Sequence, residues 1–203
     1  YETTPMGAIE TMMMDCAFNE IGKHLGLPTQ AYIALSDAKL LDAQAGLESA
    51  MGATLAVLAG INNVSGPGML DFESCFSLEK LVLDNEICGM TLRMAKGIEP
   101  KEDFPATPRF EELLKEQHLL ISKHTRRYLK EEHYFPGAVV DRANRSRWTA
   151  EGSLTLGERA HREVNKHLAA YAPSGLPDDI KRALSELMEE EGRRYGMDTL
   201  PRS

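Results

Sequence analysis

The spacing of three predicted helix starts limits the fold of this chain more than any other feature. Helices are expected to begin near residues 5, 42 and 77, which are 37 and then 35 residues apart. A short apolar segment, a polar loop and a helix fill each interval. Strands and helices that alternate in this way form a parallel sheet covered by helices, so the repeat predicts βα units of an α/β fold.

The individual elements follow from caps and apolar patterns. Helices are predicted at 5–25, from Asp42 through 59 and at 78–95, and buried strands at 31–35 and 61–65. A doubly wound sheet needs about five strands and a (β/α)8 barrel needs eight. Two or three strands therefore imply either pairing with another copy or membership of a longer protein, and we favour the longer protein.

The organisation of the chain changes near residue 97. Residues 1–97 hold 12 acids and 5 bases, whereas residues 98–203 hold 19 acids and 18 bases. We predict a βα region at 1–97 and a peripheral helical region at 98–203. Helices in the second region are predicted at 109–133, 157–171 and 177–195.

Composition excludes several classes of protein. A formal net charge of −8 is opposite in sign to that of most nucleic-acid-binding domains. The longest apolar run, 51–64, is interrupted by glycine and asparagine, so no membrane span is expected. The three cysteines have no CxxC spacing, which indicates neither a disulfide framework nor a structural zinc site. We expect a soluble cytoplasmic protein with reduced thiols and no metal site.

Ligands of parallel α/β sheets bind at the carboxyl ends of the strands, which selects two loops. The first loop, residues 36–44, contains a hydroxyl, an ammonium, an amide and two carboxylates, from Asp37 and Asp42. This set can hold a polar or cationic small molecule. In the alternative interpretation, Asp42 caps a helix and Lys39 pairs with Asp37 at the surface. The sequence leaves both interpretations open.

The second loop, residues 65–73, contains Gly66 and Gly68, where backbone can approach a ligand closely. Asp71 and Glu73 follow. The loop lacks the GxxxxGK[ST] spacing of a phosphate-binding loop, and its carboxylates would repel phosphate. A nucleotide ligand is therefore not expected.

Several short motifs together resemble the trimethylamine methyltransferase family. No single motif is decisive, but their order and spacing are specific, and the resemblance covers essentially the whole chain. The matching segments are Tyr1-Glu2-Thr3-Thr4-Pro5-Met6-Gly7-Ala8, Gly26-Leu27-Pro28, Ser36-Asp37-Ala38-Lys39, Asp42-Ala43-Gln44-Ala45-Gly46, Gly66-Pro67-Gly68-Met69-Leu70, Leu83-Asp84-Asn85-Glu86, His124-Thr125-Arg126-Arg127 and Tyr134-Phe135-Pro136.

The resemblance implies the C-terminal portion of a TIM (β/α)8 barrel with parallel strands, followed by a peripheral helical region. It also implies transfer of a methyl group from a methylated or quaternary amine to the cobalt of a cognate corrinoid protein. No cofactor is expected to bind directly, because the methyl acceptor is the cobalamin of that partner. The founding members contain pyrrolysine, which we expect to align within 39–44. This sequence has ordinary residues there, so it resembles the non-pyrrolysine branch, which uses quaternary amines such as glycine betaine.

Strand-end position and resemblance together select the candidate site residues. Asp37, Asp42 and Glu73 are the candidate catalytic carboxylates, in an electrostatic or positioning role. A quaternary ammonium is already activated as a methyl donor, so the protein mainly has to orient it. The candidate substrate-binding residues are Ser36, Lys39, Gln44, Gly66, Gly68 and His124, with Lys39 as a partner for a substrate carboxylate.

Two other functions stay open at this point. The chain can be a non-catalytic binding module or an inactive fragment of the same fold, because a partial barrel lacks strands that complete its pocket. It can also belong to another TIM-barrel enzyme that uses these carboxylates for acid–base chemistry. Unpaired strand edges lead us to expect a homo-oligomer.

Overall fold

A computed structural model describes residues 4–101, 104–173, 175–197 and 199. The chain divides into two compact units, the first ending at His167 and the second beginning at Leu168. The first unit contains every strand of the described residues. The division into 1–97 and 98–203 that we inferred from the sequence stays a prediction.

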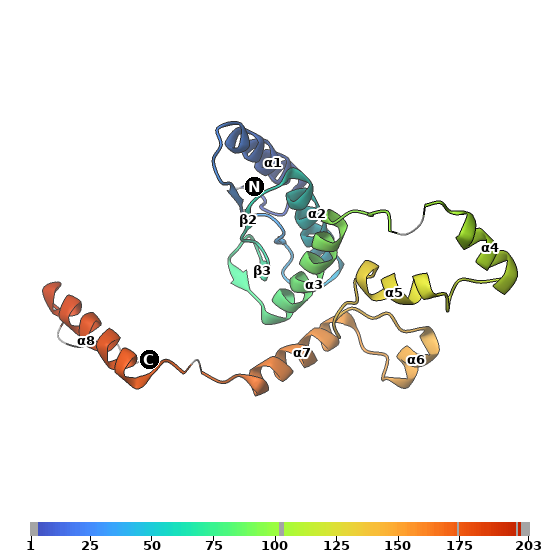
Figure 1. Ribbon diagram of the computed structural model, residues 1–203. Coiled ribbons are helices and arrows are strands. Elements are labelled where there is room, and N and C mark those ends of the chain that lie inside the picture. Colours follow the sequence, from blue (N-terminus) through green and yellow to red (C-terminus); the bar gives the residue numbers. More distant parts are fainter. Residues whose placement is uncertain (1–3, 102–103, 174, 198, 200–203) are drawn as a thin grey trace. The chain divides into compact units, whose positions relative to one another are not determined.

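Helices account for most of the regular structure (Figure 1). The helices are α1 (Ile9–His24), α2 (Ala43–Ala59), α3 (Leu78–Ala95), α4 (Thr107–Glu116), α5 (Lys123–Glu132), α6 (Arg145–Ala150), α7 (Leu156–Ala170) and α8 (Asp178–Arg194). The strands are β1 (Gln30–Ala31), β2 (Asn63–Val64), β3 (Met69–Leu70) and β4 (Cys75–Phe76).

Strands β1 and β2 form the parallel pair that the sequence predicts. Gln30 lies opposite Asn63 and Ala31 opposite Val64, and α2 connects the two strands. A second, antiparallel pair joins β3 to β4. That hairpin was not predicted. The structure is thus mostly helical with a few small strands, which is compatible with part of an α/β fold.

The predicted buried strand at 31–35 is wrong in extent, and its burial is confirmed except at Tyr32, which is 46% exposed. Only Gln30 and Ala31 pair as a strand, and Ile33, Ala34 and Leu35 are buried beyond it. Ala34 has a φ of 67°, in the left-handed region that L-residues rarely adopt, and this turn ends the extended backbone. The strand predicted at 61–65 is likewise shorter, since only Asn63 and Val64 pair.

The first helix begins later than the sequence suggests. We expected Thr4 to cap it and Pro5 to be its first residue, but α1 starts at Ile9 with no side-chain cap. The physical reason lies in the preceding segment. The backbone N–H of Gly7 donates to the Asp37 carboxylate at 2.9 Å, and the Thr11 hydroxyl donates to the Pro5 carbonyl at 2.6 Å. These bonds hold the segment outside the helix.

Helices α2 and α3 follow their sequence signals closely. The Asp42 side chain accepts from the N–H groups of Gln44 and Ala45, and Gly60 ends α2 in the left-handed conformation. The Ser77 hydroxyl caps α3 by accepting from the Lys80 N–H at 3.2 Å. Local capping chemistry therefore predicts both ends of α2 and the start of α3.

The predicted helix at 109–133 is wrong, because it is two helices. Gln117 adopts a left-handed φ of 61° after α4, and the Ser122 side chain caps α5 by accepting from Thr125 N–H. Neither glycine nor proline marks this break in the sequence. The helices predicted at 157–171 and 177–195 correspond to α7 and α8 to within a residue or so.

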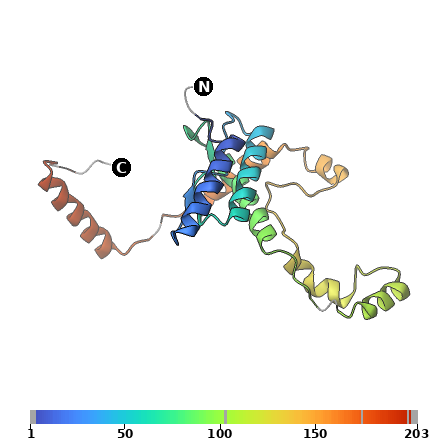
Figure 2. The same ribbon diagram turned by 90° about the horizontal axis from the view of Figure 1, so that it is seen from above.

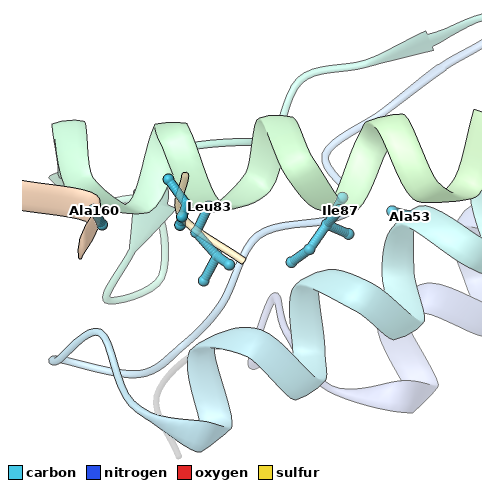
Figure 3. Close-up of a cluster of buried hydrophobic side chains, with 6 residues drawn as sticks. Ala53, Leu83, Ile87 and Ala160 are labelled. Atoms are coloured by element: carbon cyan, nitrogen blue, oxygen red, sulfur yellow. The ribbon is translucent and has the colours of Figure 1, made fainter. Parts of the chain in front are cut away.

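The hydrophobic core of the first unit lies between α2, α3 and α7. Figure 3 shows Leu83 and Ile87 of α3 with Ala53 of α2 and Ala160 of α7. Helix α1 packs on α2, and the two run side by side in Figure 2. On another side of α2, Gly52 permits close packing on the segment after β1, since a Cβ there would lie 2.6 Å from the backbone nitrogen of Ala34.

Among the described residues, no helix combines the length and the apolar character that crossing a membrane requires.

Substitution by alanine should have opposite effects on stability at Gly66 and Gly46. A Cβ on Gly66 would lie 2.2 Å from the Ile33 carbonyl oxygen, whereas one on Gly46, inside α2, would meet no atom within 4 Å. We expect Gly66→Ala to lower the free energy of unfolding by about 1–3 kcal/mol through overpacking. Gly46→Ala should raise it by about 0.5–1 kcal/mol through helix propensity. Urea denaturation measures both, and equal effects of the two substitutions would contradict the close backbone packing at Gly66.

Candidate functional site

The two loops selected from the sequence lie together at the carboxyl ends of β1 and β2. The Ser36 N–H donates to the Met69 carbonyl at 3.2 Å, and the Asp71 N–H donates to the Ala38 carbonyl at 3.1 Å. Ala38 and Leu70 also share a small buried cluster with Ala45 of α2. The two loops are therefore in direct contact, and the candidate site can be built from both.

Asp37 is the buried carboxylate at the centre of the first loop. Its side chain is buried, with the residue only 7% exposed. One oxygen, Oδ2, accepts from the Gly7 N–H at 2.9 Å, but Oδ1 is buried without a hydrogen-bond partner among the described residues. Buried polar atoms almost always have a partner, so this oxygen marks Asp37 as a candidate binding group.

Glu48 of α2 fixes the backbone of the first loop. Its Oε2 accepts from the Ser36 hydroxyl at 2.5 Å and from the Asp37 N–H at 2.9 Å, and its Oε1 accepts from the Gln44 amide at 2.9 Å. Two candidate substrate-binding residues, Ser36 and Gln44, are thus bonded to Glu48. Sequence reasoning missed Glu48, whose only local signal is its position one helical turn after Gln44.

Lys39 connects the two loops. Its ammonium donates to the Asp37 backbone carbonyl at 2.8 Å, lies 3.2 Å from Oδ1 of Asp71 and is 4.4 Å from the centroid of the Phe72 ring. The pairing of Lys39 with the Asp37 carboxylate at the surface is therefore wrong, because that carboxylate is buried and Asp71 is the partner. Phe72 was not singled out from the sequence.

The turn between β3 and β4 has an unusual backbone. Asp71, Phe72 and Glu73 all have left-handed φ angles, of 49°, 57° and 69°. Such conformations cost free energy in residues other than glycine and persist only where surrounding contacts hold them. Here the Asp71 N–H and the Lys39 ammonium bond the turn to the first loop.

Glu73, the third candidate carboxylate, lies in this turn. Burial raises its pKa, and the negative charge of Asp15 on α1 raises it further. Burial also raises the pKa of Asp15. Oε1 of Glu73 and Oδ2 of Asp15 are buried without hydrogen-bond partners in the described part of the chain. The two carboxylates therefore form an acidic pair beside the turn, and Asp15 was missed because it lies inside a predicted helix.

The two glycines of the second loop pack against the protein itself. Gly66 lies against the backbone of Ile33 and Leu35, and Gly68 has a φ of 91° that favours glycine. The Gly68 N–H donates to Oδ2 of Asp84 at 2.7 Å. Whether these glycines also contact a ligand stays a prediction.

Below Gly68 lies a fully buried ion pair. The Lys80 ammonium, on α3, bonds to Oδ2 of Asp84 and donates to the Ser49 hydroxyl of α2 at 2.6 Å. Burial raises the pKa of Asp84, while the Lys80 charge and the Gly68 N–H act in the opposite direction. Sequence reasoning missed this pair, although Lys80 and Asp84 have the i,i+4 spacing of helical ion pairs.

Two further candidate site residues, Asp42 and His124, have a different role or lie away from the loops. Asp42 caps α2, as the alternative interpretation of the first loop proposed. His124 lies on α5 with its ring 4.9 Å from that of Tyr128. Helix α5 is bonded to the last turn of α3 through Glu132 and Arg93, whereas the loops lie near the first turn of α3. The structure therefore does not bring His124 together with the loops.

No group of three or more histidine, cysteine, aspartate or glutamate side chains with the geometry of a metal site occurs within 4–101, 104–173, 175–197 and 199.

The buried ion pair gives a pH-dependent prediction. Lys80→Met leaves the Asp84 carboxylate buried without its cation, which should lower the free energy of unfolding by about 3–5 kcal/mol at pH 7. Without Lys80 the pKa of Asp84 rises further above its unfolded value, so the folded variant gains stability as the pH falls and the carboxyl group is protonated. The loss should therefore be smaller at pH 5 than at pH 7.

Urea denaturation at the two pH values measures this difference. Lys96→Met, an exposed substitution at the end of α3, is the control and should change stability little at either pH. An equal loss for Lys80→Met at pH 5 and pH 7 would contradict the role assigned to Asp84.

Comparisons with known proteins identify the family of this chain. A family model described as trimethylamine methyltransferase matches residues 3–196. The glycine betaine methyltransferase of Desulfitobacterium hafniense strain Y51 is 34% identical over 192 residues, covering 94% of this chain and 40% of the relative. The trimethylamine methyltransferase MttB of Methanosarcina barkeri strain Fusaro is 30% identical over 195 residues, with 95% and 39% coverage. MttB of Methanosarcina thermophila is 32% identical over 180 residues, with 88% and 36% coverage.

The chain thus spans about two-fifths of the length of these curated relatives. The family match nevertheless includes both loops, the strands and all eight described helices. The chain belongs to the trimethylamine methyltransferase family.

Proposed function

We propose that the full-length protein moves a methyl group from a quaternary amine to the cobalt of a partner corrinoid protein. Family membership and the names of the relatives, which act on glycine betaine or trimethylamine, support methyl transfer from an amine. The absence of pyrrolysine from residues 39–44 supports a quaternary amine over trimethylamine. Glycine betaine is the representative substrate.

One observation supports this proposal above the others: the buried Asp37 carboxylate has an oxygen without a partner at the edge where the loops meet. Isolated buried charge is unfavourable, and a cationic ligand relieves it. A quaternary ammonium has no N–H to donate, so it interacts with carboxylates through charge and with aromatic rings through cation–π contact. The Phe72 ring and the carboxylates of Asp71 and Glu73 supply such surroundings.

The chemistry requires little activation by the protein. The methyl acceptor would be the cobalt(I) of the partner corrinoid, a strong nucleophile whose own electron pair would form the Co–C bond and which would become cobalt(III). The C–N bond breaks, its electron pair stays on nitrogen, and the cation becomes a neutral tertiary amine. No proton is transferred. The residues of this chain bind and orient the cation: Asp37 and Glu73 provide negative charge, and Lys39 is available to a substrate carboxylate.

We further infer that the chain forms the later βα units of a TIM barrel in the cytoplasm. The parallel β1–α2–β2 unit supports this fold, as does the position of the loops at the carboxyl ends of the strands, where barrel enzymes bind substrates. The relatives are about two and a half times as long, which leaves room for the other βα units.

The corrinoid protein would dock at the edge where the two loops meet. We also infer a homo-oligomer.

A second candidate function is acid–base catalysis on another substrate. The Glu73 and Asp15 pair favours it, because burial raises the pKa of both carboxyl groups above their ordinary values, a shift that favours their protonated forms and their use as general acids. Methyl transfer without proton transfer does not use that property. The assay below distinguishes the two functions.

The proposed reaction is tested with the full-length protein, cob(I)alamin and a panel of methylated and quaternary amines. Methylcobalamin should form with a quaternary amine, and its absorbance spectrum reports the transfer. No spectral change with any amine would contradict the proposed reaction and would favour acid–base catalysis or a non-catalytic role.

Asp37→Asn tests the site within that assay. The amide keeps an oxygen for the Gly7 N–H but removes the negative charge. Interactions of charged groups are worth a few kcal/mol, so kcat/KM for a quaternary amine should fall about 10- to 100-fold. Glu111→Gln, which neutralises one exposed charge on α4, is the matched control. An unchanged kcat/KM for Asp37→Asn would remove Asp37 from the site even if methyl transfer occurs.

A further inference from the structure

The contacts of Lys39 describe a complete binding site for an ammonium group. A carbonyl oxygen lies 2.8 Å from its Nζ, a carboxylate oxygen 3.2 Å away and the Phe72 ring centroid 4.4 Å away. These are a hydrogen-bond acceptor, a counterion and an aromatic face. The same three elements recognise organic cations in protein binding sites.

The groups that surround the Lys39 ammonium come from both loops. Lys39 and the Asp37 carbonyl belong to the first loop, while Asp71 and Phe72 belong to the β3–β4 turn. The left-handed φ angles of Asp71 and Phe72 place that turn in a conformation that other contacts must hold. The Lys39 ammonium supplies two of those contacts, so its position and the shape of the turn depend on each other.

The Lys39 side chain makes its contacts at the surface. It is 61% exposed, and Asp71 is 41% exposed. Ion pairs at exposed positions contribute little to stability, and a primary ammonium is strongly hydrated. A quaternary ammonium is weakly hydrated and covers more of an aromatic face, so it can replace the Lys39 ammonium on Phe72.

We propose that Lys39 is a built-in competitor of the substrate: its ammonium occupies the subsite over Phe72 in which a quaternary ammonium binds. This inference rests on the proposed function and adds a specificity-determining residue to it. Because Lys39 is attached to the site, it competes at a high effective concentration. Cations that bind Phe72 no better than a primary ammonium are excluded, and a quaternary ammonium displaces Lys39.

The test uses the full-length protein and tetramethylammonium chloride, measured by isothermal titration calorimetry. Tetramethylammonium has no carboxylate, so the separate role of Lys39 as a partner for a substrate carboxylate does not affect the result. Lys39→Met keeps most of the side-chain stem but removes the charge. It should bind tetramethylammonium about three- to tenfold more tightly than the wild type, because one cation–π contact and one exposed ion pair no longer compete.

Two further variants complete the design. Phe72→Leu in the Lys39→Met background should abolish the gain, because the aromatic face is lost. Lys96→Met removes an exposed ammonium elsewhere and should leave the affinity at the wild-type value. If Lys39→Met binds no more tightly than the wild type, competition by Lys39 is contradicted.

A spectroscopic readout follows Lys39 directly. Its Nζ lies over the Phe72 ring, so the adjacent ε-methylene protons should show an upfield ring-current shift in NMR, assigned by its loss in Lys39→Met. Saturating tetramethylammonium should move this signal to its ordinary position. An unmoved signal at saturation would overturn the proposal, because the cation would then bind elsewhere. Methyl transfer with an unmoved signal would leave the proposed function intact and remove only the role of Lys39 as competitor.

Discussion

The buried pair of Lys80 and Asp84 is the interaction on which the arrangement of the loops depends. Asp84 accepts from both the Lys80 ammonium and the Gly68 N–H, and Lys80 reaches Ser49 of α2. One charged cluster, whose side chains are buried from solvent, thus joins α2, α3 and the second loop. Buried ion pairs add little net stability, but breaking one is costly. The cluster therefore fixes the position of the second loop at Gly68 more than it strengthens the fold.

Helix α2 fixes the first loop by the same means. Glu48 accepts from the Ser36 hydroxyl and the Asp37 N–H, so a carboxylate from a helix again holds a loop backbone from below. The Asp37 carboxylate in turn holds the segment before α1 through Gly7. Acidic side chains consequently gather beneath the edge at which both loops end. The negative charges of Asp37 and Glu48 thus have a structural role, and charges of this sign also favour cationic ligands.

The sequence predicted the elements whose signals are local. Helix ends are marked by residues that bond to positions two to four residues away: Asp42, Gly60 and Ser77. The structure places these helix ends where the sequence indicates them. The strands were shorter than predicted because Ala34 turns left-handed beside Gly66, a contact between residues far apart in the chain. The break at Gln117 had no glycine or proline to mark it. Pattern reasoning cannot foresee such conformations.

The candidate site likewise has features with local sequence signals and features that depend on contacts between distant residues. The position of both loops was predictable, because strand ends follow from the βα repeat, whereas the contacts of Lys39 with Asp71 and Phe72 cross between loops and have no signal in either. These contacts nevertheless bear on both the fold and the proposed function. An ammonium on one loop meets a carboxylate and a ring on the other, so the loops bind each other with the groups that suit a quaternary amine. A cation that replaces Lys39 must therefore supply the contacts that hold the left-handed turn. Binding of the substrate and the conformation of the turn are then coupled in one equilibrium.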